Sequence, residues 1–147
     1  RCGAFAVIRL CTYFLAYFCF AFCIRFSPRV GLCWTLALVL ERGLSGLAVA
    51  AFPMAKNTGL AHTFATAADR ESVQKILIVL SVLLAAALIA LGGGALVAAA
   101  LLVLWRYHHV AVKEFGGITG DLAGWFLQKA EFWMLAALAA SQWGGIL

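Results

Sequence analysis

The stretch that most constrains the fold is an apolar run over residues 76–105, which is broken near its middle by Gly92, Gly93 and Gly94. A helix rises about 1.5 Å per residue, so crossing a hydrocarbon core of about 30 Å takes roughly 20 residues. The run is too long for one ordinary span and short for two. Because lipid leaves the backbone no water to bond, the run must be helical. We therefore predict a tight helical hairpin that turns at the glycines.

The composition of the whole chain has the same character as this run. Of the 147 residues, 65% are hydrophobic and only 12% are charged. A soluble domain of this size could not hide so much apolar surface from water. The predicted fold class is all-α: a polytopic membrane helix bundle of about five transmembrane helices, forming one integral-membrane domain over residues 1–147.

The boundaries of the other spans follow from prolines and polar intervals. No charged segment with a small-residue cleavage site precedes the first apolar run, so we expect a true span there rather than a signal peptide. Polar loops are expected at 54–75, with short helices, and at 106–120. The expected spans are residues 4–24, residues 31–52, the two arms of 76–105, and residues 121–143.

The number of spans decides which polar loops share a side of the membrane. With five spans, the side that holds both polar loops carries six basic residues, whereas the opposite side carries only Arg25 and Arg29. The positive-inside rule makes the first side cytoplasmic, so both loops are expected to face the cytosol. The net charge of +5 is then expected to meet anionic headgroups or phosphates, and no nucleic acid partner is expected.

The cysteines show no pattern typical of a disulfide framework or a metal site. There is no C-x-x-C motif and no histidine at metal-binding spacing, so we expect small buried hydrophobic residues at Cys2, Cys11, Cys19, Cys23 and Cys33.

The last expected span begins with the unusual segment FGGITGDLAGWFLQKAE, residues 115–131. Its glycines Gly116, Gly117 and Gly120 allow positive φ and the close approach of another group. Thr119 is expected to cap the following helix, and Asp121 falls in the first turn, so free N–H groups and the positive end of the helix dipole gather there. Such an end favours phosphate. Asp121 suits either a divalent metal that bridges phosphates or simple capping.

A polar stripe continues down the same helix. Asp121, Gly124, Gln128 and Glu131 are spaced so that about 100° per residue leaves them within roughly 80° of one another. Ionisable groups at membrane depth are costly and usually line a cavity or pathway. The alternative is that Thr119 and Asp121 only cap, while Glu131 reaches an interface or a neighbouring helix.

Further charged residues have two interpretations each. Glu41 and Arg42 lie near the middle of the second span, and adjacent helix positions do not face each other, so each needs its own partner. A structural ion pair with another helix is one interpretation, and a guanidinium aimed at phosphate is the other. Lys56, just past Pro53, is either solvated or a phosphate ligand, and Arg9 either snorkels or contacts phosphate.

These residues resemble a known family, the adenosylcobinamide-GDP ribazoletransferases, or cobalamin synthases. The strongest likeness is the Gly-Gly-x-Thr-Gly-Asp signature of residues 116–121, followed by a helix with Gly124 and Glu131. The opening RCGAFAVI is similar to a Gly-x-x-Gly segment of the family, with Ala6 in place of the second glycine. The segment ERGLSGLAVAAFPMAKNTGLAHTF is similar to a second segment of the family. Arg42, Lys56 and Gly59 stand in the family's positions, and Ala61 stands where the family usually has a glycine.

The resemblance implies an enzyme that joins α-ribazole or its 5′-phosphate to adenosylcobinamide-GDP, with release of GMP and a requirement for Mg²⁺. It implies catalytic roles for Asp121 and Glu131, with Asp121 also a metal ligand. It further implies that the chain is the carboxyl-terminal part of a longer enzyme with an aspartate-rich segment upstream, inactive on its own. The substrate-phosphate ligands it implies are Arg42, Lys56, Thr119, Gly116, Gly117 and Gly120.

Two alternatives belong to other classes. A phospholipid-making CDP-alcohol phosphotransferase would carry an Asp-x-x-Asp-Gly-x-x-Ala-Arg motif, which this chain lacks. A transporter or structural membrane subunit could use Glu41, Arg42 and Glu131 as a charge relay, but the chain has no internal symmetry of the kind that transporters often show. The lipid bilayer is a partner in every case, and homo-oligomerisation stays open.

Overall fold

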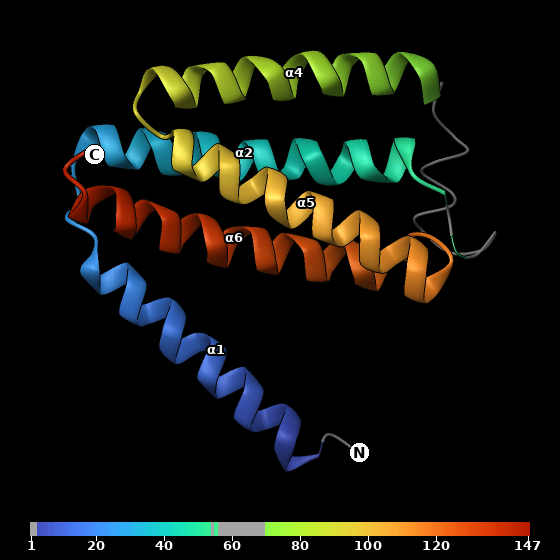
Figure 1. Ribbon diagram of the computed structural model, residues 1–147, viewed down its shortest axis with the longest axis horizontal. Helices are drawn as coiled ribbons and strands as arrows, with labels where there is room; N and C mark the ends of the chain where they lie inside the picture. The colour runs from blue at the N-terminus through green and yellow to red at the C-terminus, as the bar shows by residue number, and fades with distance from the viewer. Residues whose placement is uncertain (1–2, 54, 56–69) are drawn as a thin grey trace.

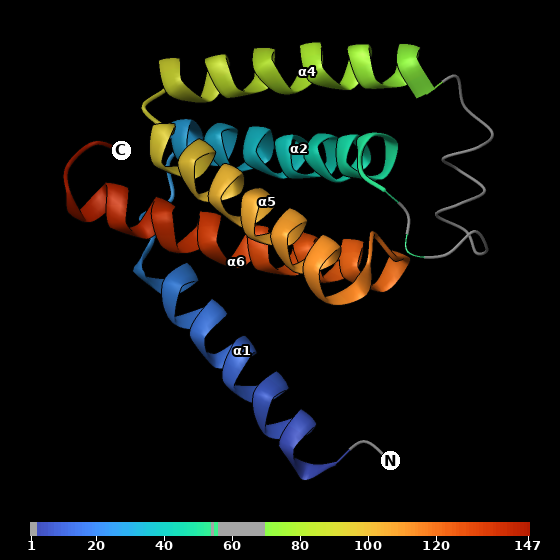
Figure 2. The same ribbon diagram turned by 45° about the vertical axis from the view of Figure 1, so that its right-hand side comes forward.

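The structure is a computed structural model that describes residues 3–53, residue 55 and residues 70–147. Four of its helices lie side by side, and the first diverges from them toward its amino-terminal end (Figures 1 and 2). The described residues form α-helices and no strand, as the all-α prediction requires. The helices are α1 (Ala4–Cys23), α2 (Pro28–Ala51), α4 (Arg70–Ala90), α5 (Gly94–Phe115) and α6 (Gly120–Trp143).

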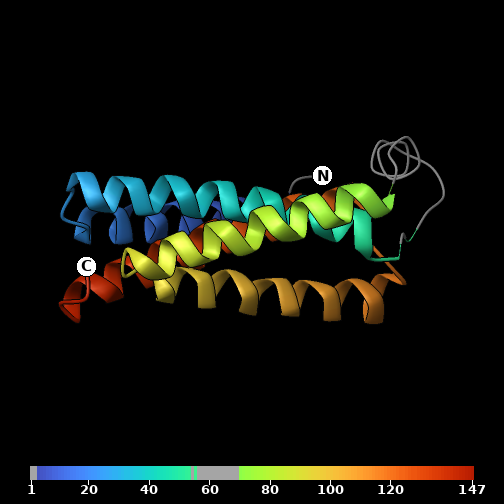
Figure 3. The ribbon, with the colours of Figure 1, turned by 90° about the horizontal axis from the view of Figure 1, so that it is seen from above.

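The predicted hairpin between residues 76 and 105 is confirmed. Helices α4 and α5 are joined through Gly92, which has a φ of 90°, and Gly93. The Gly93 N–H donates to the Leu88 carbonyl over 2.7 Å, and a Cβ on Gly93 would lie 3.1 Å from that same oxygen. The glycines are therefore needed for both the turn and the close approach. Seen from above, α4 crosses from the start of α5 to the end of α2 (Figure 3).

The predicted loop at 106–120 is wrong for most of its length. Helix α5 continues to Phe115, and only residues 116–119 separate it from α6. Tyr107 and Ala111, four residues apart, are fully buried, whereas the polar residues between them are exposed. This spacing is that of an amphipathic helix, which extends α5 beyond its purely apolar part.

Two further helix starts differ from the predicted boundaries. Helix α4 begins at Arg70, although its apolar sequence starts only at Ile76. Helix α2 begins at Pro28 rather than Gly31, because Ser27 caps it by accepting a hydrogen bond from the Val30 N–H. Proline suits this first helical position, where its missing N–H is not needed.

One end of the bundle, the hairpin end, gathers the α1–α2 turn, the α4–α5 turn and the carboxyl end of α6. The Arg29 guanidinium donates to the Leu91 carbonyl over 3.0 and 2.6 Å, which satisfies a carbonyl left open at the end of α4. The Gln142 side chain exchanges two hydrogen bonds of 2.8 Å with the backbone of Arg25.

The opposite end, the loop end, gathers the segment after α2, the start of α4 and the loop between α5 and α6. The Ile118 N–H donates to the Pro53 carbonyl over 2.8 Å, and the Ala55 N–H donates to the Ile118 carbonyl over 3.0 Å. Ile118 is only 1% exposed, so this pairing is part of the packed interior. The glycine-rich loop and the beginning of the polar segment after Pro53 thus meet at one end of the bundle.

The core lies between α2, α5 and α6. The Tyr107 and Phe126 rings stack there with centroids 5.1 Å apart, which joins α5 to α6. Small residues recur in this core and let the helices approach closely, as is usual between membrane helices. The buried small residues include Cys33, Ala37, Ala48, Ala100, Ala111 and Ala130.

Helix α1 has no buried residue and packs on α6. Of its cysteines, Cys11, Cys19 and Cys23 are exposed, so the expectation of buried cysteines is wrong for them; it is right for Cys33 on α2, and Cys2 lies outside the described residues. The reason is that so few neighbours cover α1, which leaves Phe22, for example, 89% exposed.

Exposed apolar side chains also cover α4, where Ile76 is 66% and Leu83 63% exposed. Among the described residues, α1, α2, α4 and α5 are long and apolar enough to cross a membrane. Helix α6 is as long but carries Asp121, Lys129 and Glu131. The chain is a helical membrane protein.

Candidate active site

The loop between α5 and α6 is shaped by its glycines. Gly116 ends α5 in the left-handed region with a φ of 69°, and Gly117 has a φ of 150°. The N–H groups of both glycines donate to the Ala111 carbonyl, which closes the end of α5. Among the described residues, a Cβ added to Gly116 or Gly120 would meet no atom within 4 Å. No part of the chain that the structure describes therefore covers the outer surface of the loop.

The amino terminus of α6 has the predicted geometry. Thr119 is the N-cap, and its hydroxyl accepts from the Leu122 N–H over 3.3 Å. Within the described part of the chain, the N–H groups of Gly120 and Asp121 have no acceptor. Unsatisfied N–H groups at the positive end of a helix dipole are a ready site for an anion such as phosphate.

Asp121 is exposed in the first turn of α6 and forms no ion pair with any described residue. Its carboxylate is therefore free to bind a cation, in addition to stabilising the helix terminus. Lys56, the predicted phosphate ligand at this end, lies outside the described residues. The backbone pairing of Ala55 with Ile118 brings the chain just before Lys56 against the loop.

A second group of predicted residues lies deeper in the bundle. Glu131 follows Asp121 by ten residues, so the two Cα atoms are about 15 Å apart along the helix axis. The Tyr17 hydroxyl on α1 donates to Glu131 Oε1 over 2.8 Å. The Tyr13 hydroxyl, one turn away, donates to the Gln128 carbonyl over 3.3 Å. The polar stripe on α6 therefore meets two tyrosines of α1 at this level.

Glu41 on α2 completes this deeper group, which we name the tyrosine–glutamate cluster: Tyr13, Tyr17, Glu41 and Glu131. Glu41 is 0% exposed, and neither of its carboxylate oxygens accepts a hydrogen bond from the described residues. Its charge lies within electrostatic range of Glu131 and of both tyrosines. A buried ionisable group at membrane depth points to function by default.

Arg42 lies at the level of the cluster and not at the loop end. Its side chain is 65% exposed, and its Nε lies 3.4 Å from Oε1 of the neighbouring Glu41. The expectation that these two adjacent residues each need a partner elsewhere is therefore wrong, because the long Arg42 side chain reaches back to Glu41. Arg42 precedes the end of α2 at Ala51 by nine positions, which places it about 14 Å from the loop end along the helix axis. The predicted site residues therefore occupy two levels of the bundle. Arg9, at the start of α1, lies over the Phe5 ring at 5.3 Å.

The two tyrosines were not among the residues singled out from the sequence. Their spacing of four in an apolar span was a signal that could have been used, because it places two hydroxyls on one face of a helix. The partner helix could not have been read from that spacing, since the contacts join residues more than one hundred positions apart.

The fold and the site define a class: a helical membrane protein with an open, capped helix terminus at one end and a buried acidic cluster below it. Comparison with known proteins narrows this class. The chain belongs to the cobalamin-5-phosphate synthase family, whose model matches residues 1–139.

A curated relative extends the comparison. Over 140 residues the chain is 36% identical to the adenosylcobinamide-GDP ribazoletransferase of Lachnoclostridium phytofermentans, a match that covers 93% of this chain and 52% of the relative. The chain thus spans about half the length of that relative. No solved structure matches it significantly.

Proposed function

We propose that the protein joins α-ribazole or its 5′-phosphate to adenosylcobinamide-GDP in cobalamin biosynthesis. In this reaction a ribose hydroxyl attacks the cobinamide-side phosphorus, a new O–P bond forms, the diphosphate bond breaks, and GMP leaves. Family membership and the named relative support this proposal. The observation in the structure that supports it is the amino terminus of α6, where the N–H groups of Gly120 and Asp121 have no acceptor among the described residues.

The chain's own contribution is to bind and position phosphate. Transfer of a phosphoryl group from a diphosphate depends mainly on positioning and on neutralising charge. The open surface at Gly116 and Gly120 lets a diphosphate approach the backbone, and the N–H groups at the start of α6 point at it. Gly117 and Thr119 hold the loop and the helix start in place. Lys56, which lies outside the described residues, is proposed to add positive charge.

Mg²⁺ is part of this proposal, with Asp121 as one of its ligands. Mg²⁺ is commonly held by one or two carboxylates together with substrate phosphates, and it would neutralise the charge of the diphosphate. The residues fit such a partial site, because Asp121 is exposed beside these N–H groups and forms no ion pair with a described residue. The described residues contain no group of three or more metal-binding side chains, so further ligands would come from the substrate or from other parts of the protein.

Glu131 and Arg42 are proposed to contact a different part of the substrate. Glu131 is about 15 Å from Asp121 along α6, too far for both to hold one small ion. Adenosylcobinamide-GDP is large enough to reach both levels of the bundle. Arg42, whose guanidinium is largely exposed, is free to contact a second anionic group at the deeper level, and Glu131 to accept a hydrogen bond there.

We further place the protein in the bacterial inner membrane as a multi-pass protein, with the loop end in the cytosol. The support is the charge distribution: Lys75 and Lys113 lie toward the loop end, and Arg25 and Arg29 lie at the hairpin end. Water-soluble nucleotides such as GMP would be released on the cytosolic side.

The experiment is an assay of GMP release from adenosylcobinamide-GDP by the intact protein. Asp121→Asn should lower turnover at least a hundredfold at fixed Mg²⁺, because it removes a charge that faces the metal and phosphate. The matched control is Glu114→Gln, which removes another exposed carboxylate near the same loop and should leave turnover within about twofold. Unchanged turnover in Asp121→Asn would refute the proposed role.

A further inference from the structure

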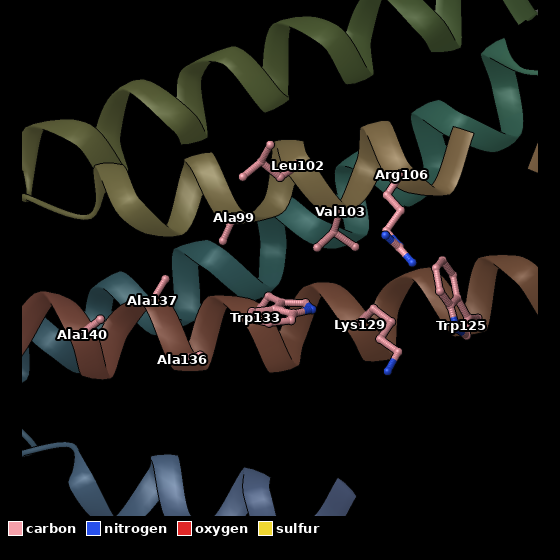
Figure 4. A pocket seen from close by; sticks show the side chains of 10 residues that line it. All are labelled: Ala99, Leu102, Val103, Arg106, Trp125, Lys129, Trp133, Ala136, Ala137 and Ala140. Carbon is pink, nitrogen blue, oxygen red and sulfur yellow. The ribbon is translucent and has the colours of Figure 1, made fainter. Parts of the chain in front are cut away.

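A groove of about 790 Å³ runs between α5 and α6 on the outside of the bundle. Figure 4 shows the Arg106 side chain extending from α5 toward α6 and Trp125, whereas the Lys129 side chain points away from it. The rest of the lining is aliphatic apart from a second indole ring: Ala99, Leu102, Val103, Trp133, Ala136, Ala137 and Ala140. Arg106 is therefore the cation that faces into an otherwise apolar groove.

Arg106 lies at membrane depth. It precedes the end of α5 at Phe115 by nine positions, so it is about 14 Å from the loop end along the helix axis. Arg42 and Glu131 lie at nearly the same level. Helix α5 is among the helices that can cross a membrane, and 14 Å is more than one arginine side chain spans. The guanidinium therefore does not reach the headgroup region by extending along the helix.

Arg106 has no partner in the part of the chain that the structure describes, where it forms no ion pair. Charged side chains at membrane depth almost always face other protein or a water-filled cavity, and they pair with opposite charges or carbonyls. Here the opening is uncovered, since Leu102 at the rim is 66% exposed and Trp133 is 54% exposed. A lipid tail over this opening would leave the charge unpaired. The groove therefore needs an occupant that brings a polar partner.

The walls of the groove have the form of a helix-packing surface. Ala136 and Ala140 on α6 are four residues apart, and Ala99 lines the groove from α5. Small residues at this spacing let the backbone of another helix approach closely, as is usual between membrane helices. The shape of the groove thus indicates a transmembrane helix as the occupant, and the charge of Arg106 indicates that this helix carries a carboxylate.

A second copy of this chain does not supply that carboxylate from its described residues. Glu41 is 0% exposed, and Glu131 accepts a hydrogen bond from Tyr17 of its own chain. Three further acids lie toward the loop end and not at the level of Arg106: Glu71, Glu114 and Asp121. The remaining acid, Asp69, lies outside the described residues. The partner helix is therefore expected to have a different sequence.

We propose that this groove is the docking site of one further transmembrane helix. That helix carries a carboxylate near its middle, which pairs with Arg106, and small residues where it crosses Ala136 and Ala140. The chain covers only 52% of its curated relative, so a family protein of that length has further chain to form such a helix. A polar pair between membrane helices strengthens their association on the order of tenfold.

The test measures the binding of a synthetic helix to the intact 147-residue chain in phosphatidylcholine bilayers. The probe is a leucine–alanine peptide of about 22 residues with lysines at both ends and one glutamate at its middle. A nitroxide label beside the glutamate quenches tryptophan fluorescence on contact. The signal of Trp133 is isolated as the difference between the unaltered protein and Trp133→Phe. The glutamate peptide should quench this signal at a peptide-to-lipid ratio on the order of tenfold lower than the same peptide with glutamine at its middle.

Three variants separate the site from a general effect. Arg106→Gln should reduce the preference for the glutamate peptide to nearly one. The matched control, Lys113→Gln, removes an exposed cation of the same helix that does not line the groove and should keep the preference. Ala136→Leu fills part of the groove and should weaken quenching by both peptides.

Three outcomes would overturn the proposal. Equal quenching by the two peptides in the unaltered protein would show that the groove does not select a carboxylate. Quenching by neither peptide would show that lipid or a second copy of the chain fills the groove. A preference that persists in Arg106→Gln would show that the carboxylate pairs elsewhere.

Discussion

Glu41 offers the sharpest test of how the bundle balances stability against function. Its side chain is 0% exposed, neither oxygen accepts a hydrogen bond from the described residues, and a second acid, Glu131, lies within electrostatic range. Among the described residues, the only favourable charge is the Arg42 Nε at 3.4 Å, on a side chain that is itself 65% exposed. Leaving a polar group buried without partners costs about 1–3 kcal/mol.

Glu41→Met should therefore raise the free energy of unfolding by about 1–3 kcal/mol. Methionine has a similar length and adapts to irregular space, so it fills the site without the desolvation cost. Arg42 loses its neighbour but is exposed enough to be hydrated. The measurement is a denaturant titration of the intact protein in detergent micelles, followed by circular dichroism, with GMP release measured in parallel.

The control for this prediction is Glu71→Met, which removes an exposed carboxylate paired with Lys75 at 2.9 Å and should change stability by less than about 1 kcal/mol. A Glu41→Met protein that is less stable than the parent by more than about 1 kcal/mol would refute the reasoning, because the carboxylate would then have to be well bonded. A stabilised protein with reduced turnover would mean that Glu41 is kept for function at a cost in stability.

Two further predictions concern the loop and the tyrosines. Gly116→Ala should lower the free energy of unfolding by about 1–2 kcal/mol, because φ is 69° there although the space around a Cβ is open. Gly124→Ala is also in open space but lies inside α6, so it should raise the free energy of unfolding by up to about 1 kcal/mol. The same unfolding titration measures both, and a neutral Gly116→Ala would contradict the left-handed conformation. Tyr17→Phe removes the donor to Glu131 and should destabilise by about 1–3 kcal/mol, more than Tyr13→Phe, whose hydroxyl reaches a carbonyl at 3.3 Å. Equal effects of the two tyrosine substitutions would argue against that hydrogen bond.

The helices could be predicted from sequence because membrane helices are set by local apolarity and by glycine. The hairpin at Gly92 and Gly93 and the cap at Thr119 both follow from residues within a few positions of the feature. The extension of α5 to Phe115 was missed for a different reason. Its polar residues suggested a loop, while the helical spacing of Tyr107 and Ala111, which pack inward, was the stronger signal.

The arrangement of the candidate site was less predictable. The sequence identifies Asp121, Glu131 and Arg42 as charged residues that need partners and places Arg42 near the middle of its span, but it does not show which of them lie together. The structure separates Asp121 from the other two because the antiparallel α2 and α6 bring the middle of one beside the middle of the other. The link from Glu131 to Tyr17 depends on how α1 packs, which no local pattern determines.

The central claim is that the two polar segments, after α2 and between α5 and α6, lie at one face of the membrane. Single cysteines at Glu71, Glu114 and Phe26, in a background without the native cysteines, test it with a membrane-impermeant thiol reagent on sealed vesicles. The account predicts that Glu71→Cys and Glu114→Cys react from the same, cytosolic side and that Phe26→Cys reacts from the other. Reaction of Glu71→Cys and Glu114→Cys from opposite sides would contradict it.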